Sequence, residues 1–258
     1  MRVMLATPTL ARTPAVEYQM AVLRTSMLLS QYGHSLDCSF VGGDCFVSKA
    51  RNGLIQTFIE TWTTDHPDDV LVFMDDDQGW EEAAFLRIIQ DPHEFIAVCI
   101  PKKTDPETFN NVILDYNDKG ECYVDNGLLR ASQIGSGFIA LKRSAIEKMI
   151  KAFPDQYSPG DGGPHGLHYN LFENMVIKPE VGKGIGQFWG EDLIFCKKWC
   201  SIGEHIWIDP NVTMTHIGRK TWVGNFMTYL QKNATVKLSD PEPAPIPETL
   251  ESILRIAA

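Results

Sequence analysis

The chain has 258 residues, a length that fits one large domain, or one domain with an appendage, around a sizeable core. Its 33 acidic residues against 23 Lys and Arg give a formal net charge of −10, which argues against nucleic acid or an anionic membrane as the main partner. No run of about 18 apolar residues occurs and the N-terminus lacks a signal-peptide pattern, so we expect no transmembrane segment and a cytoplasmic location. The six cysteines show neither zinc spacing nor a dense disulfide framework, which favours reduced thiols.

Short apolar runs alternate with helical patterns over the first hundred residues. Val16, Met20, Leu23 and Met27 recur at helical spacing and predict a helix that ends near Gly33. The alternation predicts an α/β fold with a mostly parallel sheet covered by helices on both faces. Ligands of such sheets bind beyond the carboxyl ends of the strands. The predicted strands are 3–6, 35–41, 71–74 and 95–100.

The regular alternation of strand and helix patterns does not continue in the second half of the chain. Residues 112–124 predict a small antiparallel hairpin region, and residues 190–201 predict a helix. Residues 154–187 are rich in glycine and proline and predict a long functional or mobile loop. Residues 236–258 contain a proline-rich linker and then a short apolar segment, 250–256, which we expect to dock on its own chain or to make a homo-oligomer contact.

An acidic cluster, Asp75-Asp76-Asp77, directly follows the buried strand 71–74. Side chains alternate along an extended segment, so Asp75 and Asp77 can point the same way. Three like charges are costly to place together unless a cation neutralises them, and Mg²⁺ or Mn²⁺ prefers carboxylate oxygens. The alternative is a solvated acidic turn at the start of the next helix. The position directly after a buried strand favours the metal site.

Further motifs stand near the ends of predicted elements. Each has an ordinary structural explanation when taken alone: a turn, a capped helix, an acid near a helix N-terminus, or a hydrogen-bonded histidine. They are Thr7-Pro8-Thr9, Ala50-Arg51-Asn52, Gly135-Ser136-Gly137, Trp189-Gly190-Glu191-Asp192 and Thr213-Met214-Thr215-His216.

In this order along an α/β pattern, the motifs resemble those of nucleotide-sugar glycosyltransferases of the GT-A fold, near the inverting family 2 group. The resemblance covers roughly residues 1–220 and rests on the set rather than on any one motif. It implies a GT-A (Rossmann-like) domain over residues 1–235. Residues 1–110 would form the nucleotide-binding half and 111–235 the acceptor half.

The resemblance implies roles on the donor side, for a UDP- or GDP-linked sugar. Asp77 would coordinate Mn²⁺ or Mg²⁺ with His216 as the last ligand, while Asp75 or Asp76 would contact the ribose or the metal shell. Arg51 would contact the diphosphate or the base. The remaining donor contacts would come from Thr7, Pro8 and Thr9, which hold the base and ribose, and from Arg219 and Lys220, which close over the diphosphate.

On the acceptor side, the resemblance implies that Asp192 is the general base for a glycan or other hydroxyl, with Glu191 orienting it or contacting the acceptor. Gly135, Ser136, Gly137 and Trp189 would lie near the acceptor. Donor sites look alike in inverting and retaining enzymes, so the stereochemistry stays open. A nucleotidyltransferase of related fold and a non-catalytic nucleotide- or glycan-binding domain remain alternatives. The former should carry a glycine-rich loop after the first strand, which Thr7-Pro8-Thr9 lacks.

Overall fold

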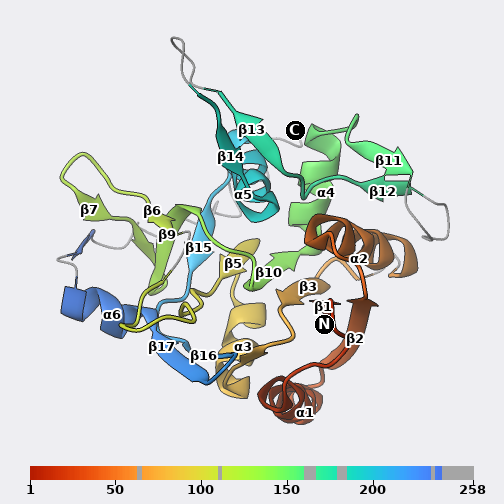
Figure 1. Ribbon diagram of the computed structural model, residues 1–258, viewed down its shortest axis with the longest axis horizontal. Helices are drawn as coiled ribbons and strands as arrows, with labels where there is room; N and C mark the ends of the chain where they lie inside the picture. The colour runs from red at the N-terminus through yellow and green to blue at the C-terminus, as the bar shows by residue number, and fades with distance from the viewer. Residues whose placement is uncertain (63–65, 110–111, 160–166, 179–184, 234–235, 240–258) are drawn as a thin grey trace, which may run out of the picture.

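The computed structural model describes residues 1–62, 66–109, 112–159, 167–178, 185–233 and 236–239. Its central strands are β1 (Arg2–Thr9), β2 (Ser35–Gly42), β3 (Val70–Met74), β5 (Phe95–Ala97), β6 (Ile113–Leu114), β8 (Val124–Asp125), β9 (Leu128–Gln133), β10 (Phe138–Lys142) and β15 (Ile206–Ile208). In the described residues these form one sheet in the order β2-β1-β3-β10-β5-β15-β9-β6, with β8 beside β9 (Figure 1).

The predicted α/β fold is confirmed, with a mixed sheet. Strands β1, β2, β3, β5 and β15 share one direction, as the alternating pattern predicted. Strand β10 lies antiparallel between β3 and β5, and β9 lies antiparallel beside β15. The first strand is longer than predicted, because Thr7-Pro8-Thr9 continues β1.

Helices cover both faces of the sheet, as expected. They are α1 (Val16–Gln31), α2 (Val47–Thr61), α3 (Glu82–Gln90), α4 (Arg143–Ala152), α5 (Glu191–Ser201) and α6 (Phe226–Asn233). Successive residues of β1 alternate between two apolar clusters: Val3 and Leu5 pack with α1 and α3, whereas Met4 and Ala6 pack with α2, α4 and α5. No helix in the described part of the chain has the length and apolar surface that a membrane span requires.

Helix α1 is confirmed, and Gly33 just beyond it has a φ of 72°, as expected for a residue that ends a helix. The stripe that predicted the helix is nevertheless not its packed face, because all four of its residues are exposed. The indole of Trp80 packs against the Tyr18 ring at 5.5 Å and donates to Thr25 Oγ1 at 3.0 Å. The buried face consists of Tyr18, Ala21, Thr25 and Leu29.

Small sheets occupy the second half. Strands β4 (Gln78–Gly79), β16 (Thr213–Ile217) and β17 (Thr221–Asn225) form one of them, with β16 in the middle. Part of the predicted loop 154–187 is ordered as strands, while 160–166 and 179–184 lie outside the described residues, as does the C-terminal segment 240–258. The other pairs are β11 (Tyr157–Pro159) with β12 (Leu167–Tyr169), β13 (Met175–Ile177) with β14 (Gln187–Trp189), and β7 (Glu121–Cys122) with β18 (Lys237–Leu238).

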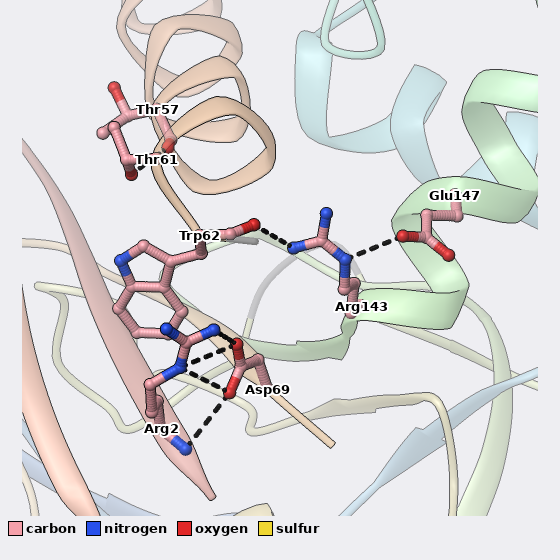
Figure 2. A network of polar contacts seen from close by, with 7 residues as sticks. All are labelled: Arg2, Thr57, Thr61, Trp62, Asp69, Arg143 and Glu147. Carbon is pink, nitrogen blue, oxygen red and sulfur yellow. Dashed lines mark hydrogen bonds and ion pairs between the residues drawn. The ribbon is translucent and has the colours of Figure 1, made fainter. Parts of the chain in front are cut away.

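Charged side chains fasten the edge of the sheet at which the parallel strands begin (Figure 2). Asp69, just before β3, is fully buried and accepts from Arg2 Nε at 3.0 and 3.1 Å. The Arg2 guanidinium also lies 5.0 Å from the centre of the Trp62 ring. Arg143 donates to the Trp62 carbonyl at 2.8 Å and to Glu147 at 2.7 Å. The contacts join α2, α4, β1 and β3 at the edge opposite to the one where ligands of such sheets bind.

A half-buried histidine just after α3 connects the end of this helix to β8 and β15. His93 Nδ1 lies 2.6 Å from Asp91, Nε2 lies 3.0 Å from Asp125, and the ring lies 4.5 Å from that of Trp207. Burial alone would lower the pKa of His93, but the two carboxylates outweigh it and raise the pKa above its ordinary value.

Candidate active site

A pocket of about 520 Å³ opens where β1 and β3 end. It collects side chains from β1, α2, the acidic cluster, the segment before β10, the start of α5, and β16. The sequence therefore predicted most of its wall. The predicted residues that line it are Pro8, Thr9, Arg51, Asp75, Asp76, Asp77, Gly135, Ser136, Gly137, Glu191, Asp192 and His216.

Four predicted site residues are not part of the pocket wall. Thr7 is buried, and its hydroxyl lies 2.5 Å from the Tyr18 hydroxyl instead of facing a ligand. Arg219 and Lys220 are exposed at the turn between β16 and β17, where Lys220 pairs with Asp105. Trp189 ends β14, with the Lys197 ammonium 5.4 Å from the centre of its ring.

The acidic cluster is held by its backbone. Asp75 N donates to Gly137 O at 3.1 Å, because β10 runs antiparallel to β3 with Phe138 opposite Met74, which brings Gly137 next to Asp75. Asp76 O accepts from Ala15 N at 2.8 Å, and Asp77 O accepts from Ile217 N at 2.7 Å. Backbone hydrogen bonds from three other segments therefore hold the backbone of the three aspartates.

The three side chains have different partners. Asp75 contacts Arg51, Asp76 accepts from the Thr9 hydroxyl, and Asp77 pairs with the Lys103 ammonium. The Asp75 side chain is 35 % exposed towards the pocket, yet desolvation by the surrounding protein outweighs Arg51 and raises the pKa of Asp75. Asp75 and Asp77 therefore have different ion-pair partners, although both line the pocket.

Arg51 connects the two halves of the pocket. It projects from α2, is 4 % exposed, and places Nη2 3.0 Å from Asp75 and Nη1 2.5 Å from Glu191. Its guanidinium also lies 5.8 Å from the centre of the Phe172 ring. The forked group is thus committed to two carboxylates, which makes it a positioning residue for both sides of the pocket.

His216 reaches the acidic cluster because β16 pairs with β4, opposite Gln78. Its Nδ1 lies 2.8 Å from Pro101 O, and a carbonyl oxygen can only accept, so Nδ1 carries the proton of this bond. In the neutral imidazole, Nε2 then directs a lone pair towards Asp77 Oδ1, 3.5 Å away. Two acceptors that face each other need a proton or a cation between them.

The donor set of Asp77 and His216 therefore fits a divalent ion such as Mn²⁺. Burial alone would raise the pKa of Asp77, but in the absence of a cation the protonated His216 ring and the Lys103 ammonium outweigh burial and hold that pKa below its usual range. Among the described residues, no group of three or more His, Cys, Asp or Glu side chains is placed to hold a metal. An ion bound here would need oxygens of a ligand to complete its shell.

The acidic pair Glu191-Asp192 begins α5, with Gly190 as the N-cap. Glu191 is turned towards Arg51, whereas Asp192 Oδ1 accepts from Leu193 N at 2.8 Å. Asp192 Oδ2 faces Gly135, at which a Cβ would lie 3.7 Å from this oxygen. Of the two acids, Glu191 forms an ion pair with Arg51, whereas Asp192 has no ion-pair partner in the described part of the chain.

The sequence did not single out several residues of the site. Lys102, Cys45 and the buried Gln78 line the pocket, and Lys103 pairs with Asp77. Their position in the sequence could have indicated the two lysines, because both closely follow the predicted strand 95–100 and the ends of such strands bind ligands.

No known family model matches the chain, and no curated protein sequence matches it. Among solved structures, it is similar to the crystal structure of a glycosyltransferase involved in the glycosylation of the major capsid of PBCV-1. The identity is 11 % and the TM-score is 0.32, over 59 % of this chain and 65 % of that one.

Proposed function

We propose that the protein is a glycosyltransferase that moves a sugar from a UDP- or GDP-linked donor to an acceptor hydroxyl. One observation carries the proposal: a single pocket holds an acidic cluster at one side and a helix-opening acidic pair at the other, and Arg51 bridges them. The first is suited to a metal diphosphate, and the second to removal of a proton from a hydroxyl.

Asp77 and His216 would hold Mn²⁺ or Mg²⁺, and the donor diphosphate would bind at the same end of the pocket. The bound ion supplies Lewis-acid stabilisation of charge on the leaving group. The Lys103 ammonium and the neighbouring Lys102 add positive charge at the same place, which an anionic ligand needs in a chain of net charge −10. Thr9 and Asp76 offer polar groups to the nucleoside at the end of β1.

Asp192 is the general base of the proposed reaction. Its Oδ2 takes the proton from the acceptor hydroxyl while the hydroxyl oxygen attacks the anomeric carbon, and the bond to the diphosphate breaks on the opposite face, which gives inversion. Glu191 cannot take this role easily, because Arg51 occupies its carboxylate. The absence of a side chain on Gly135 leaves space for the acceptor beside Asp192.

A panel of nucleotide sugars tests the proposal without knowledge of the acceptor. Expected is hydrolysis of one UDP- or GDP-sugar that depends on added Mn²⁺ or Mg²⁺, and loss of diphosphate binding in Asp77→Ala. Release of inorganic pyrophosphate from a nucleoside triphosphate would instead indicate a nucleotidyltransferase. Nucleotide or glycan binding without turnover on any donor would indicate a binding domain.

Asp192→Asn separates the base from the donor site. Once an acceptor is known, this variant should bind donor as the wild type does and lose about 10²- to 10⁴-fold in transfer rate. Glu82→Gln is the matched control, because Glu82 is also an acid in the first turn of a helix but lies outside the pocket. Full transfer by Asp192→Asn would refute the assignment of the base.

A further inference from the structure

Helix α1 presents to solvent the apolar stripe from which it was predicted. Val16 is 70 % exposed, Met20 43 %, Leu23 59 % and Met27 67 %. At about 100° per residue, these four side chains lie on the side of the helix directly opposite the buried face. Figure 1 shows α1 at the periphery of the molecule, with one side against α3 and β2 and the other free of protein.

The spacing of this stripe, called here the α1 seam, is that of a helix–helix interface. Steps of four, three and four residues average about 3.7 residues, close to the 3.6 residues per turn of an α-helix, so the four side chains form a nearly straight row along which a second helix can pack. The helix is already anchored by its opposite face, so the α1 seam is not needed for the core. Exposed contiguous apolar surface of this kind marks a contact site.

The charges beside the seam select the partner. Glu17 and Arg24 lie on the same side of the seam, one heptad apart, and both are exposed without an ion-pair partner among the described residues. In an antiparallel pair of two α1 helices, Val16 lies opposite Met27 of the second copy and Met20 opposite Leu23. The same register brings Glu17 beside Arg24 of the second copy, twice by symmetry.

A parallel pair would not match these charges, because Glu17 would then face no basic residue. A membrane surface is also a poor match, since helices that lie on membranes carry a polar face rich in Lys and Arg, and this chain has a net charge of −10. We propose that the α1 seam docks antiparallel against the α1 seam of a second copy of this chain, with reciprocal Glu17–Arg24 pairs.

Four side chains form a short seam, so a concentration-dependent equilibrium is expected rather than a permanent dimer. Sedimentation velocity of the full chain over a wide concentration range should show a shift from 29.0 kDa towards twice that mass. Leu23→Glu should raise the dissociation constant at least about tenfold. Phe188→Glu is the matched control, because Phe188 is 67 % exposed on β14, outside the seam, and the dissociation constant should not change.

Charge exchange tests the antiparallel register. Glu17→Arg and Arg24→Glu should each weaken the dimer, and the double variant should return it towards the wild-type constant, which a merely structural role would not produce. Circular dichroism checks that each variant is folded. A monomer at every concentration, a dimer indifferent to Leu23→Glu, no recovery in the double variant, or binding of monomers to anionic vesicles would each overturn the proposal.

Discussion

Removal of the Arg51 guanidinium is the sharpest test of how the pocket is held together. In Arg51→Met, the carboxylates of Asp75 and Glu191 lose hydrogen bonds of 3.0 and 2.5 Å. Hydrogen bonds to charged groups contribute about 1.5–3 kcal/mol each, which would give about 3–6 kcal/mol for the pair. The Asp75 side chain is 35 % exposed and can be rehydrated, so we expect a loss of about 3 kcal/mol in the free energy of unfolding.

Arg51→Lys keeps the charge but not the fork, so it should retain one of the two bonds and lose about 1–2 kcal/mol. Urea denaturation at pH 7 measures both values, provided that the slope with urea concentration is unchanged. Arg219→Met, at an exposed turn, is the control and should stay within about 0.5 kcal/mol of wild type. A loss below about 1 kcal/mol in Arg51→Met, or wild-type stability in Arg51→Lys, would refute the bridging role.

Three further predictions concern the pocket and the pH dependence of stability. Gly137→Ala would place a Cβ 2.5 Å from Gln78 Nε2 and should weaken nucleoside-diphosphate binding at least about tenfold by calorimetry, whereas Gly135→Ala meets only an ordinary contact and should leave that binding intact. Cys45 is exposed in the pocket wall, so its alkylation should block nucleoside-diphosphate binding. The variant Cys45→Ser should bind the nucleoside diphosphate equally before and after treatment with the reagent. Binding by fully alkylated wild-type protein would contradict the placement of Cys45 at the ligand. The raised pKa of His93 stabilises the fold below its ordinary pKa of about 6.5, and this contribution is lost as the pH rises through the folded-state pKa, so His93→Gln should cost more stability in urea at pH 6 than at pH 8.

The sequence predicted the helices and strands better than it predicted which of them pair or pack together. The strands and helices of the first half follow from local periodicity. No local pattern predicts that β10 lies antiparallel between β3 and β5. The packed face of α1 was also hidden, because its second stripe contains the more apolar residues. Burial of Thr25 is compensated by the hydrogen bond from Trp80, a contact made across 55 residues that no window of the sequence contains.

The pocket was predicted for a general reason: parallel strands deliver their carboxyl ends to one edge, so motifs placed after strands meet there. This reasoning placed the acidic cluster and Thr7-Pro8-Thr9 at one edge, whereas only the resemblance to glycosyltransferases placed the Glu191-Asp192 pair beside them. It could not predict which side chain contacts which. A ligand contact of Arg51 stays a prediction, and its pairing with two carboxylates could not be foreseen from the sequence. Lys103 depends on the conformation of a loop, and the orientation of His216 depends on the pairing of β16 with β4.

The two edges of the sheet differ in how completely their buried charges are paired. At the pocket edge, three successive carboxylates lie close together, and the raised pKa of Asp75 means that its ionised form is less stable in the folded chain than in the unfolded chain. Sites that bind ligands commonly carry such unfavourable terms because the bound state, not the free one, relieves them. At the opposite edge the buried charges are paired and stabilise the fold. Asp69 is completely buried and accepts hydrogen bonds from Arg2, and Arg143 joins α2 to α4. A diphosphate and its cation should therefore raise the thermal stability of this chain by acting at the pocket edge alone, and variants at Asp69 should lower it without changing ligand affinity.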